Sequence, residues 1–156
     1  MKLWILRHGQ TEPQAAADSL RELTAAGREE VTAVSAALAG TALDAVIASP
    51  LIRAQQTAKL ACETAVFPGG VITADWLVPE ADPRDVIDEL GKRTEGNLLL
   101  VSHQPLVSQL ISLLVEGHRR GNYPMPTAGL ACIEVEHIAA GLARLLSLES
   151  PAGRMV

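Results

Sequence analysis

The sequence predicts an α/β fold built on a mainly parallel sheet with helices on both faces. Three observations support this prediction. Short apolar runs alternate along the chain with longer segments of helical periodicity, as in repeated strand–helix units. The first run, Lys2–Leu6, is apolar at consecutive positions, which is typical of a strand covered on both faces. The run Asn97–Ser102 is the most apolar of the set, so we expect it near the middle of the sheet.

The first half of the chain is predicted to form two strand–helix units. Thr24 is a good N-cap for a helix whose apolar residues recur at helical spacing. A second strand is expected over Asp44–Ala48. Ser49 would cap the helix that follows, with Pro50 in its first turn, where the missing N–H costs nothing. We expect that helix to run to about Thr64.

In the second half, strands and helices continue to alternate until two strands close the chain. The expected elements, in chain order, are a strand at Val71–Thr73, a proline-bearing loop at Leu77–Pro83, a short helix at Arg84–Lys92, the apolar strand, a helix from Pro105 through Val115, a loop at Gly117–Gly129, and strands at Leu130–Glu136 and Leu142–Glu149. The last two strands are predicted to form an antiparallel hairpin.

The length and charge of the chain limit what it can do. Its 156 residues suit one compact domain, which we expect to span residues 1–156. The net charge of −5 argues against nucleic acid or an acidic membrane as a partner, because such a surface releases few counterions from a polyanion. An anionic substrate would need positive charge concentrated in a pocket.

The apolar segments and the cysteines predict a cytoplasmic protein. The opening run Leu3–Leu6 is too short for a signal peptide, and no stretch reaches the ~20 apolar residues that span a bilayer. Cys62 and Cys132 lie in apolar surroundings and match no redox-motif or metal spacing. We therefore expect two buried, reduced thiols.

Polar and charged side chains follow three of the predicted strands at the point where each ends. They are Arg7 and His8 after the first strand, Ser49 and then Arg53 after the second, and His103 after the most apolar one. Ligands of open α/β sheets bind at the carboxyl ends of the strands, where helix N-termini also present free N–H groups. We therefore expect these side chains to converge on one crevice. Guanidinium groups bind phosphoryl oxygens in pairs, so the crevice suits a phosphoryl group.

A histidine in such a crevice can serve as a nucleophile, a general base or a metal ligand. A metal site is disfavoured, because the neighbours of His8 and His103 are cationic or neutral and no carboxylate is spaced to complete a ligand set. We therefore expect no metal and no cofactor. Flanking arginines lower the pKa of a histidine, which keeps the ring neutral and nucleophilic. A second histidine, protonated beside the bound dianion, could share the charge of the transition state.

Three motifs carry a resemblance to a known family. They are Leu6–Glu12 (LRHGQTE), Ser49–Ala58 (SPLIRAQQTA) and Val101–His103 (VSH). In this order, each at a predicted strand end, they resemble the three motifs of the histidine phosphatase superfamily. The resemblance implies a phosphoglycerate mutase-like fold of three αβα layers, with a mainly parallel central sheet.

The resemblance also implies a role for each motif residue. By analogy, His8 is the residue that becomes phosphorylated during turnover. Arg7, Arg53 and His103 would form the rest of the phosphate pocket, and Ser49 would lie at the edge of the pocket while capping its helix. No metal takes part in this scheme.

The similarity narrows to the SixA-type phosphohistidine phosphatases and covers nearly the whole chain. The segments that resemble this subgroup are Asp18–Gly27, Leu98–Leu106 and Pro126–Gly129. Larger members of the superfamily carry insertions that would wall in a small substrate. Because these are absent here, we expect an open cleft that admits a phosphohistidine borne by another protein, such as a phosphorelay protein. A small phosphate ester is the alternative substrate.

One segment departs from the family pattern. Ester-cleaving members use a glutamate as general acid in a segment of the form L-x-E, whereas Leu77–Glu80 (LVPE) has proline at that spacing. Glu80 is the candidate acid, and an ordinary loop carboxylate is an equally good interpretation. A phosphoramidate leaving group needs less assistance than an alkoxide, because a protonated imidazole leaves readily. The departure therefore favours a phosphohistidine substrate.

Two other functions are compatible with these motifs. The alternatives are a small-molecule phosphomonoester phosphatase or mutase of the same superfamily, and a catalytically inactive phosphate-recognition module. Asp18 and Arg21 are predicted to form an ion pair that shapes the loop after His8. The basic cluster His118–Arg120 is interpreted as a solvated loop, or as a docking site if it lies on the pocket rim. His137 is predicted to lie on the surface.

Overall fold

Seven strands form one sheet in the computed structural model, which describes residues 1–155. Their order across the sheet is β3-β2-β4-β1-β5-β6-β7. The strands are β1 (Lys2–Arg7), β2 (Ala45–Ala48), β3 (Val71–Thr73), β4 (Asn97–Ser102), β5 (Leu130–Glu134), β6 (Arg144–Ser150) and β7 (Gly153–Arg154). Each predicted strand is present, and β4 is paired on both sides as expected. The short β7 was not predicted.

The sheet has a parallel half and an antiparallel half. Strands β3, β2, β4 and β1 run parallel to one another. Strands β5, β6 and β7 each run antiparallel to their neighbours. The loop after α4 returns the chain to the carboxyl end of the sheet, and turns without a helix join the last three strands, so each must reverse direction. The predicted mainly parallel arrangement therefore holds only for β3-β2-β4-β1, and the whole sheet is mixed.

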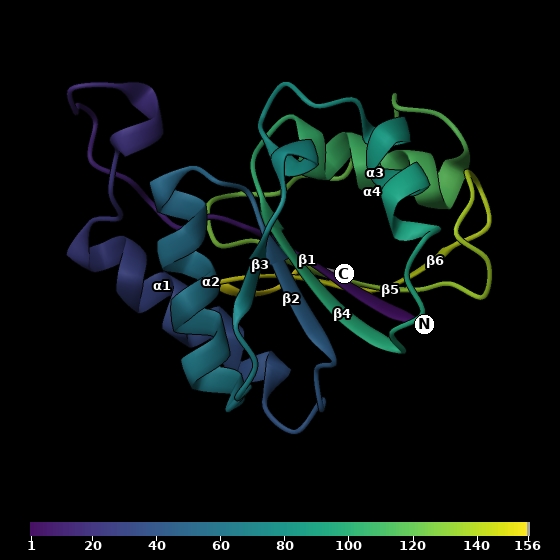
Figure 1. The fold of residues 1–156 in the computed structure, drawn as a ribbon, viewed down its shortest axis with the longest axis horizontal. Coiled ribbons are helices and arrows are strands. Elements are labelled where there is room, and N and C mark those ends of the chain that lie inside the picture. The colour runs from purple at the N-terminus through teal and green to yellow at the C-terminus, as the bar shows by residue number, and fades with distance from the viewer. Residues whose placement is uncertain (156) are drawn as a thin grey trace.

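The helices lie in two layers, one on each side of the sheet (Figure 1). They are α1 (Ala25–Ser35), α2 (Ile52–Ala65), α3 (Pro83–Leu90) and α4 (Leu106–Glu116), with short 3-10 turns η1 (Asp18–Leu20), η2 (Ala36–Leu38) and η3 (Asp75–Leu77). Helices α1 and α2 pack together on one face, and α3 and α4 pack together on the other. The predicted three-layer αβα architecture is confirmed.

Strand β1 shows why its sequence is apolar at consecutive positions. Leu3 and Ile5 belong to the core cluster that includes α3 and α4, whereas Trp4 and Leu6 belong to the cluster that includes α1 and α2. Successive side chains of a strand point to opposite faces, so a strand covered on both sides needs apolar residues at every position. Strand β1 thereby holds the segment that follows it against both layers.

The helix starts confirm one predicted cap and correct another. Thr24 precedes α1, and its Oγ1 accepts a hydrogen bond from the Gly27 N–H at 2.9 Å, as predicted. The prediction that Ser49 caps α2 with Pro50 in the first turn is wrong. Helix α2 begins only at Ile52, two residues past that proline. The hydroxyl of Ser49 is instead directed to His103, which follows β4.

The cysteines and the helices can be compared with the expectations from the sequence. Both cysteines, Cys62 and Cys132, are buried and unpaired, which confirms the prediction of buried free thiols. Of the helices within residues 1–155, none is both long enough and apolar enough to cross a membrane.

Candidate active site

The ends of three adjacent strands bring the candidate residues together. Arg7 ends β1 and His8 follows it, Ser49 follows β2, and His103 follows β4. Strand β4 lies between β2 and β1, and all three are parallel, so their carboxyl ends lie at the same edge. Backbone hydrogen bonds extend this pairing beyond the strands, from His8 N–H to the Ser102 oxygen at 3.1 Å. The rings of His8 and His103 consequently lie 5.1 Å apart between centroids.

His8 is buried, and one of its ring nitrogens is already bound. Its Nδ1 lies 2.8 Å from the main-chain oxygen of Gly9. A carbonyl oxygen can only accept, so Nδ1 carries the proton and Nε2 keeps a free lone pair. Burial, together with the charges of Arg53 and Arg7, lowers the pKa of His8 to about 4. At neutral pH the ring is therefore neutral, with the lone pair that a nucleophile requires.

Two glycines allow the loop that carries His8 to pack directly on helix α1. A Cβ at Gly9 would lie 2.7 Å from the Gly27 oxygen, and a Cβ at Gly27 would lie 2.1 Å from the Gln10 oxygen. The Gly9 N–H also donates to Thr57 Oγ1 of α2 at 3.2 Å. The loop after β1 is thus held by both helices of its layer, which positions the imidazole. Sequence reasoning did not assign these positioning contacts to Gly27 or Thr57.

His103 is almost fully buried, with 1% of its surface exposed. Its Nε2 lies 2.7 Å from Ser49 Oγ, and its Nδ1 is buried with no hydrogen-bond partner among residues 1–155. Burial lowers the pKa of His103 to about 3, with His8 and Arg53 acting in the same direction. In the free chain this ring is therefore neutral, whereas the sequence analysis considered a protonated ring beside a bound dianion.

Two arginines supply the positive charge. Arg53 lies in the first turn of α2 with 4% of its surface exposed, and Arg7 is half-buried. Arg7 Nη1 donates to the main-chain oxygen of Met125 at 2.9 Å. Burial and the charge of Arg53 lower the pKa of Arg7. In both arginines the Nε is buried and lacks a partner within the described chain, so each guanidinium keeps an unused donor.

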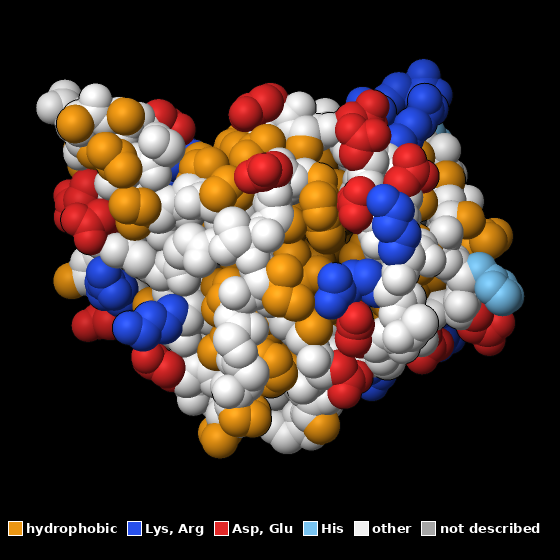
Figure 2. All heavy atoms as spheres, viewed as in Figure 1, with side chains coloured by type: hydrophobic (Ala, Val, Ile, Leu, Met, Phe, Trp, Pro, Cys, Tyr) orange, Lys and Arg blue, Asp and Glu red, His pale blue; other side chains and the backbone are white. Residues whose placement is uncertain are grey.

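The loop after β1 adds an ionic link that was only partly predicted. Arg21 Nε lies 3.0 Å from Asp18 Oδ1, which confirms the predicted ion pair. The same carboxylate also reaches the pocket, because Arg53 Nη2 lies 3.2 Å from Asp18 Oδ2 and Arg53 Nη1 donates to the Asp18 main-chain oxygen at 2.9 Å. Arg53 and Arg21 hold the pKa of the Asp18 carboxyl below its usual value. In Figures 1 and 2 this loop forms a projecting lobe, with a notch between it and the body of the protein.

The remaining candidates are Glu80, the basic cluster His118–Arg120 and His137. Glu80 is exposed in the turn before α3 and forms no hydrogen bond or ion pair within residues 1–155, so its role as an acid stays a prediction. In the basic cluster after α4, Arg119 pairs with Asp82 at the start of α3. His137 is exposed, as the sequence analysis expected.

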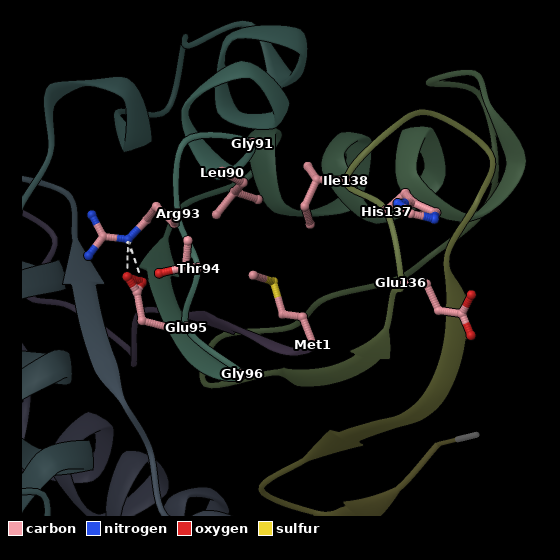
Figure 3. A pocket seen from close by; sticks show the side chains of 10 residues that line it. All are labelled: Met1, Leu90, Gly91, Arg93, Thr94, Glu95, Gly96, Glu136, His137 and Ile138. Atoms are coloured by element: carbon pink, nitrogen blue, oxygen red, sulfur yellow. Dashed lines mark hydrogen bonds and ion pairs between the residues drawn. The ribbon is translucent and has the colours of Figure 1, made fainter.

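A hollow of about 500 Å³ lies at the opposite end of the sheet (Figure 3). Its wall includes the end of α3, the residues before β4 and the segment after β5, where His137 is found. Arg93 and Glu95 form an ion pair on this wall, at 2.9 Å. None of the catalytic candidates lines the hollow, so the cluster at the carboxyl ends of the strands is the candidate active site.

Comparison with known proteins identifies the family of this chain. The family model described as the histidine phosphatase superfamily (branch 1) matches residues 3–71. The phosphohistidine phosphatase SixA of Escherichia coli K12 is 31% identical, over 75% of this chain and 76% of its own length. The chain therefore belongs to the histidine phosphatase superfamily.

Two further comparisons relate the chain to individual phosphatases of that family. The structure of the protein histidine phosphatase SixA complexed with tungstate superposes with a TM-score of 0.86 and 27% identity, covering 97% of this chain and 98% of that one. The adenosylcobalamin/alpha-ribazole phosphatase of Escherichia coli K12 is 38% identical over 74% of this chain and 79% of its own length. The chain is a phosphatase of the SixA type.

Proposed function

We propose that this phosphatase removes phosphate from phosphohistidine on another protein, with His8 as a covalent nucleophile. The observation that carries the proposal is the state of His8. Its Nδ1–H is bound to Gly9, its pKa is about 4, and its Nε2 lone pair is free beside two arginines. The names of the two SixA relatives support the choice of substrate.

The reaction has two displacement steps. In the first, His8 Nε2 attacks phosphorus, the bond between phosphorus and the substrate imidazole breaks, and the leaving imidazole takes up a proton. In the second, water attacks the phosphorus on His8, the new P–N bond breaks, and inorganic phosphate leaves as the water loses a proton. The loosely bonded phosphoryl group in each transition state carries negative charge on its three equatorial oxygens, which cationic donors stabilise.

The surrounding side chains bind and neutralise these oxygens. The unused Nε–H groups of Arg7 and Arg53 and the unpartnered Nδ1 of His103 are the buried polar atoms of the cluster that a phosphoryl group would engage. Losing one such donor typically costs on the order of 10²–10³ in rate. We propose that these groups suffice and that no metal ion takes part, which predicts full activity in the presence of a chelator.

The shape of the site supports a protein substrate. Only three residues separate β2 from α2, and three separate β4 from α4, so no inserted segment walls the pocket there. Figure 2 shows an open notch beside the lobe formed by the loop after β1. Glu80 is exposed, which suits a substrate whose protonated imidazole leaves without a strong acid.

The deciding experiment compares phosphate release from a phosphohistidine-bearing protein and from a small phosphomonoester. We expect fast release from the phosphohistidine, loss of release in His8→Ala, and a transient phosphoenzyme label that this variant lacks. His137→Ala is the matched control, because it removes an exposed histidine at the opposite end of the sheet. Release by His8→Ala at the wild-type rate would contradict the assignment of the nucleophile.

A small-molecule phosphomonoester phosphatase is the second candidate, and one observation favours it. The adenosylcobalamin/alpha-ribazole phosphatase matches this chain at 38% identity. This function predicts that the ester is the better substrate and that Glu80→Gln reduces its turnover more than tenfold, as expected for loss of a general acid (~10²–10⁴ in rate). Phosphate binding without any release would instead favour the inactive recognition module.

A further inference from the structure

The hydrogen bond between Ser49 and His103 joins two strand ends that are 54 residues apart in sequence. Ser49 is fully buried, and its Oγ lies 2.7 Å from His103 Nε2. The same oxygen also accepts a longer hydrogen bond, from the Leu51 N–H at 3.3 Å. The backbone fixes the position of the serine, because its own N–H donates to the Val101 oxygen of β4 at 3.0 Å. The backbone at Ser49 is therefore fixed beside β4, which keeps its hydroxyl close to His103.

Counting donors and acceptors distinguishes the two neutral tautomers of His103. If Nε2 carried the proton, it would donate to Ser49 Oγ. The serine hydroxyl proton would then lack an acceptor, and the Nδ1 lone pair would lack a donor. If Nδ1 carries the proton, the serine hydroxyl donates to Nε2, and only the Nδ1–H is left without a partner among residues 1–155. Because unsatisfied buried polar groups are costly, the second tautomer is favoured.

We propose that Ser49 is a positioning residue that holds His103 in the Nδ1–H tautomer, so that a neutral histidine donates a hydrogen bond from Nδ1 to the transferring phosphoryl group. The second half of this proposal rests on the proposed function, whereas the tautomer does not. The rings of His103 and the nucleophile His8 lie 5.1 Å apart between centroids in the free chain, so the His103 ring is next to the nucleophile before substrate binds. A donor set in advance needs no reorganisation during the reaction.

The electrostatic surroundings agree with a neutral ring. Burial and the neighbouring His8 and Arg53 keep the pKa of His103 at about 3 in the free chain. An imidazolium here would add a third positive charge to a buried cluster that already contains Arg7 and Arg53. A neutral N–H donor avoids that cost and still offers a proton to a phosphoryl oxygen.

The first test is nuclear magnetic resonance of the free protein labelled with ¹⁵N in its histidines. We expect the ¹⁵N chemical shift of His103 Nδ1 in the range of a protonated ring nitrogen, and that of Nε2 in the range of an unprotonated one. A protonated Nε2 at neutral pH would overturn the proposal. This measurement involves no substrate, so it tests the tautomer of His103 independently of the phosphatase reaction.

The second test replaces the serine. In Ser49→Ala the tautomer is no longer held, so we expect the two nitrogen shifts to move toward each other. We expect kcat on the phosphohistidine substrate to fall roughly 10- to 100-fold with KM changed less than about twofold. Ser49→Thr keeps a hydroxyl donor and should retain both the wild-type shifts and most of the activity.

Ser112→Ala is the matched control, because Ser112 is a fully buried serine on α4 whose hydroxyl bonds to the loop after that helix. Thermal unfolding of all three variants separates loss of fold from loss of positioning. Unchanged His103 shifts in a folded Ser49→Ala protein would overturn the proposal. Absence of phosphatase activity in the wild type, with the Nδ1–H tautomer intact, would instead count against the proposed function.

Discussion

The two ends of the central sheet differ in the hydrogen bonding of their arginine side chains. At the end near the start of β4, Arg93 directs its Nε at Glu95, with distances of 3.1 and 2.9 Å to the two carboxylate oxygens. At the other end, Arg7 and Arg53 leave the same atom buried and without a partner in the described chain. A buried donor without a partner costs about 1–3 kcal/mol, so a fold retains it where a ligand supplies the acceptor. The unpartnered donors are the reason to place the proposed anion site at the carboxyl ends of the strands.

The largest expected effect is on kcat/KM when Arg53 is removed, and removal of Arg93 at the opposite end of the sheet is its control. Arg53→Ala should lower kcat/KM by about 10²–10³, because a buried cation that neutralises the transition state is lost. Arg93→Ala should leave kcat/KM within about twofold, since it removes only a partly exposed ion pair. Steady-state kinetics on the same phosphohistidine substrate checks both, and equal losses would contradict the contrast between the two ends.

The burial of His8 makes the stability of the fold depend on pH. The pKa of His8 is about 4 in the folded chain, against about 6.5 when unfolded. Between these values the His8 ring binds more protons in the unfolded chain than in the folded one, so its contribution to stability falls as the pH falls from 6.5 to 4 and then levels off. For His8 alone the loss is about 3 kcal/mol across this window.

Urea unfolding at several pH values measures this loss, and His8→Asn should show a smaller one. His137→Asn, at the opposite end, should behave like the wild type, because that ring is exposed. The low pKa of His8 also predicts that kcat/KM keeps its acidic limb near pH 4 and not near 6.5. An acidic limb near 6.5 would show that the nucleophile is not desolvated as the structure has it.

A smaller effect is expected where the loop of His8 meets α1. In Gly27→Ala the new methyl would lie 2.1 Å from the Gln10 oxygen, so the loop must shift, at a cost of about 1–3 kcal/mol in unfolding free energy. Gly70→Ala is the control, because a Cβ there would meet nothing within 4 Å. Thermal unfolding compares the two, and activity should fall in Gly27→Ala alone. Equal melting temperatures would argue against a tight contact behind the nucleophile.

The smallest expected effect concerns the carboxylate that reaches into the cationic end. Asp18 pairs with Arg53, so it opposes an incoming phosphate. Asp18→Asn should lower the inhibition constant of inorganic phosphate roughly two- to fivefold, a modest change because the carboxylate is largely exposed. Asp88→Asn on α3 is the control for loss of one exposed negative charge. Weaker inhibition by phosphate would show that Asp18 mainly orients Arg53.

Much of the fold followed from patterns that are local in sequence. The apolar runs predicted β1, β2 and β4, and Thr24 marked the start of α1. The antiparallel hairpin of β5 and β6 was predicted, but the antiparallel pairing of β5 with β1 was not, because the direction of β5 depends on where the loop after α4 returns the chain. Ser49 was predicted to cap a helix, because a serine before a proline favours that position, but its shorter hydrogen bond is to His103, which follows β4.

In the candidate site too, some features could be predicted from the sequence and others could not. The sequence by itself determined which residues follow the strands: Arg7, His8, Arg53 and His103 belong to motifs whose positions can be recognised without coordinates. Only the tertiary structure decided how those residues are paired and charged. It placed Asp18 on Arg53 and Ser49 on His103, and it lowered the pKa of both histidines by burying them. The physical reason is that burial and hydrogen-bond partners arise between segments distant along the chain, whereas a motif records only neighbours in sequence.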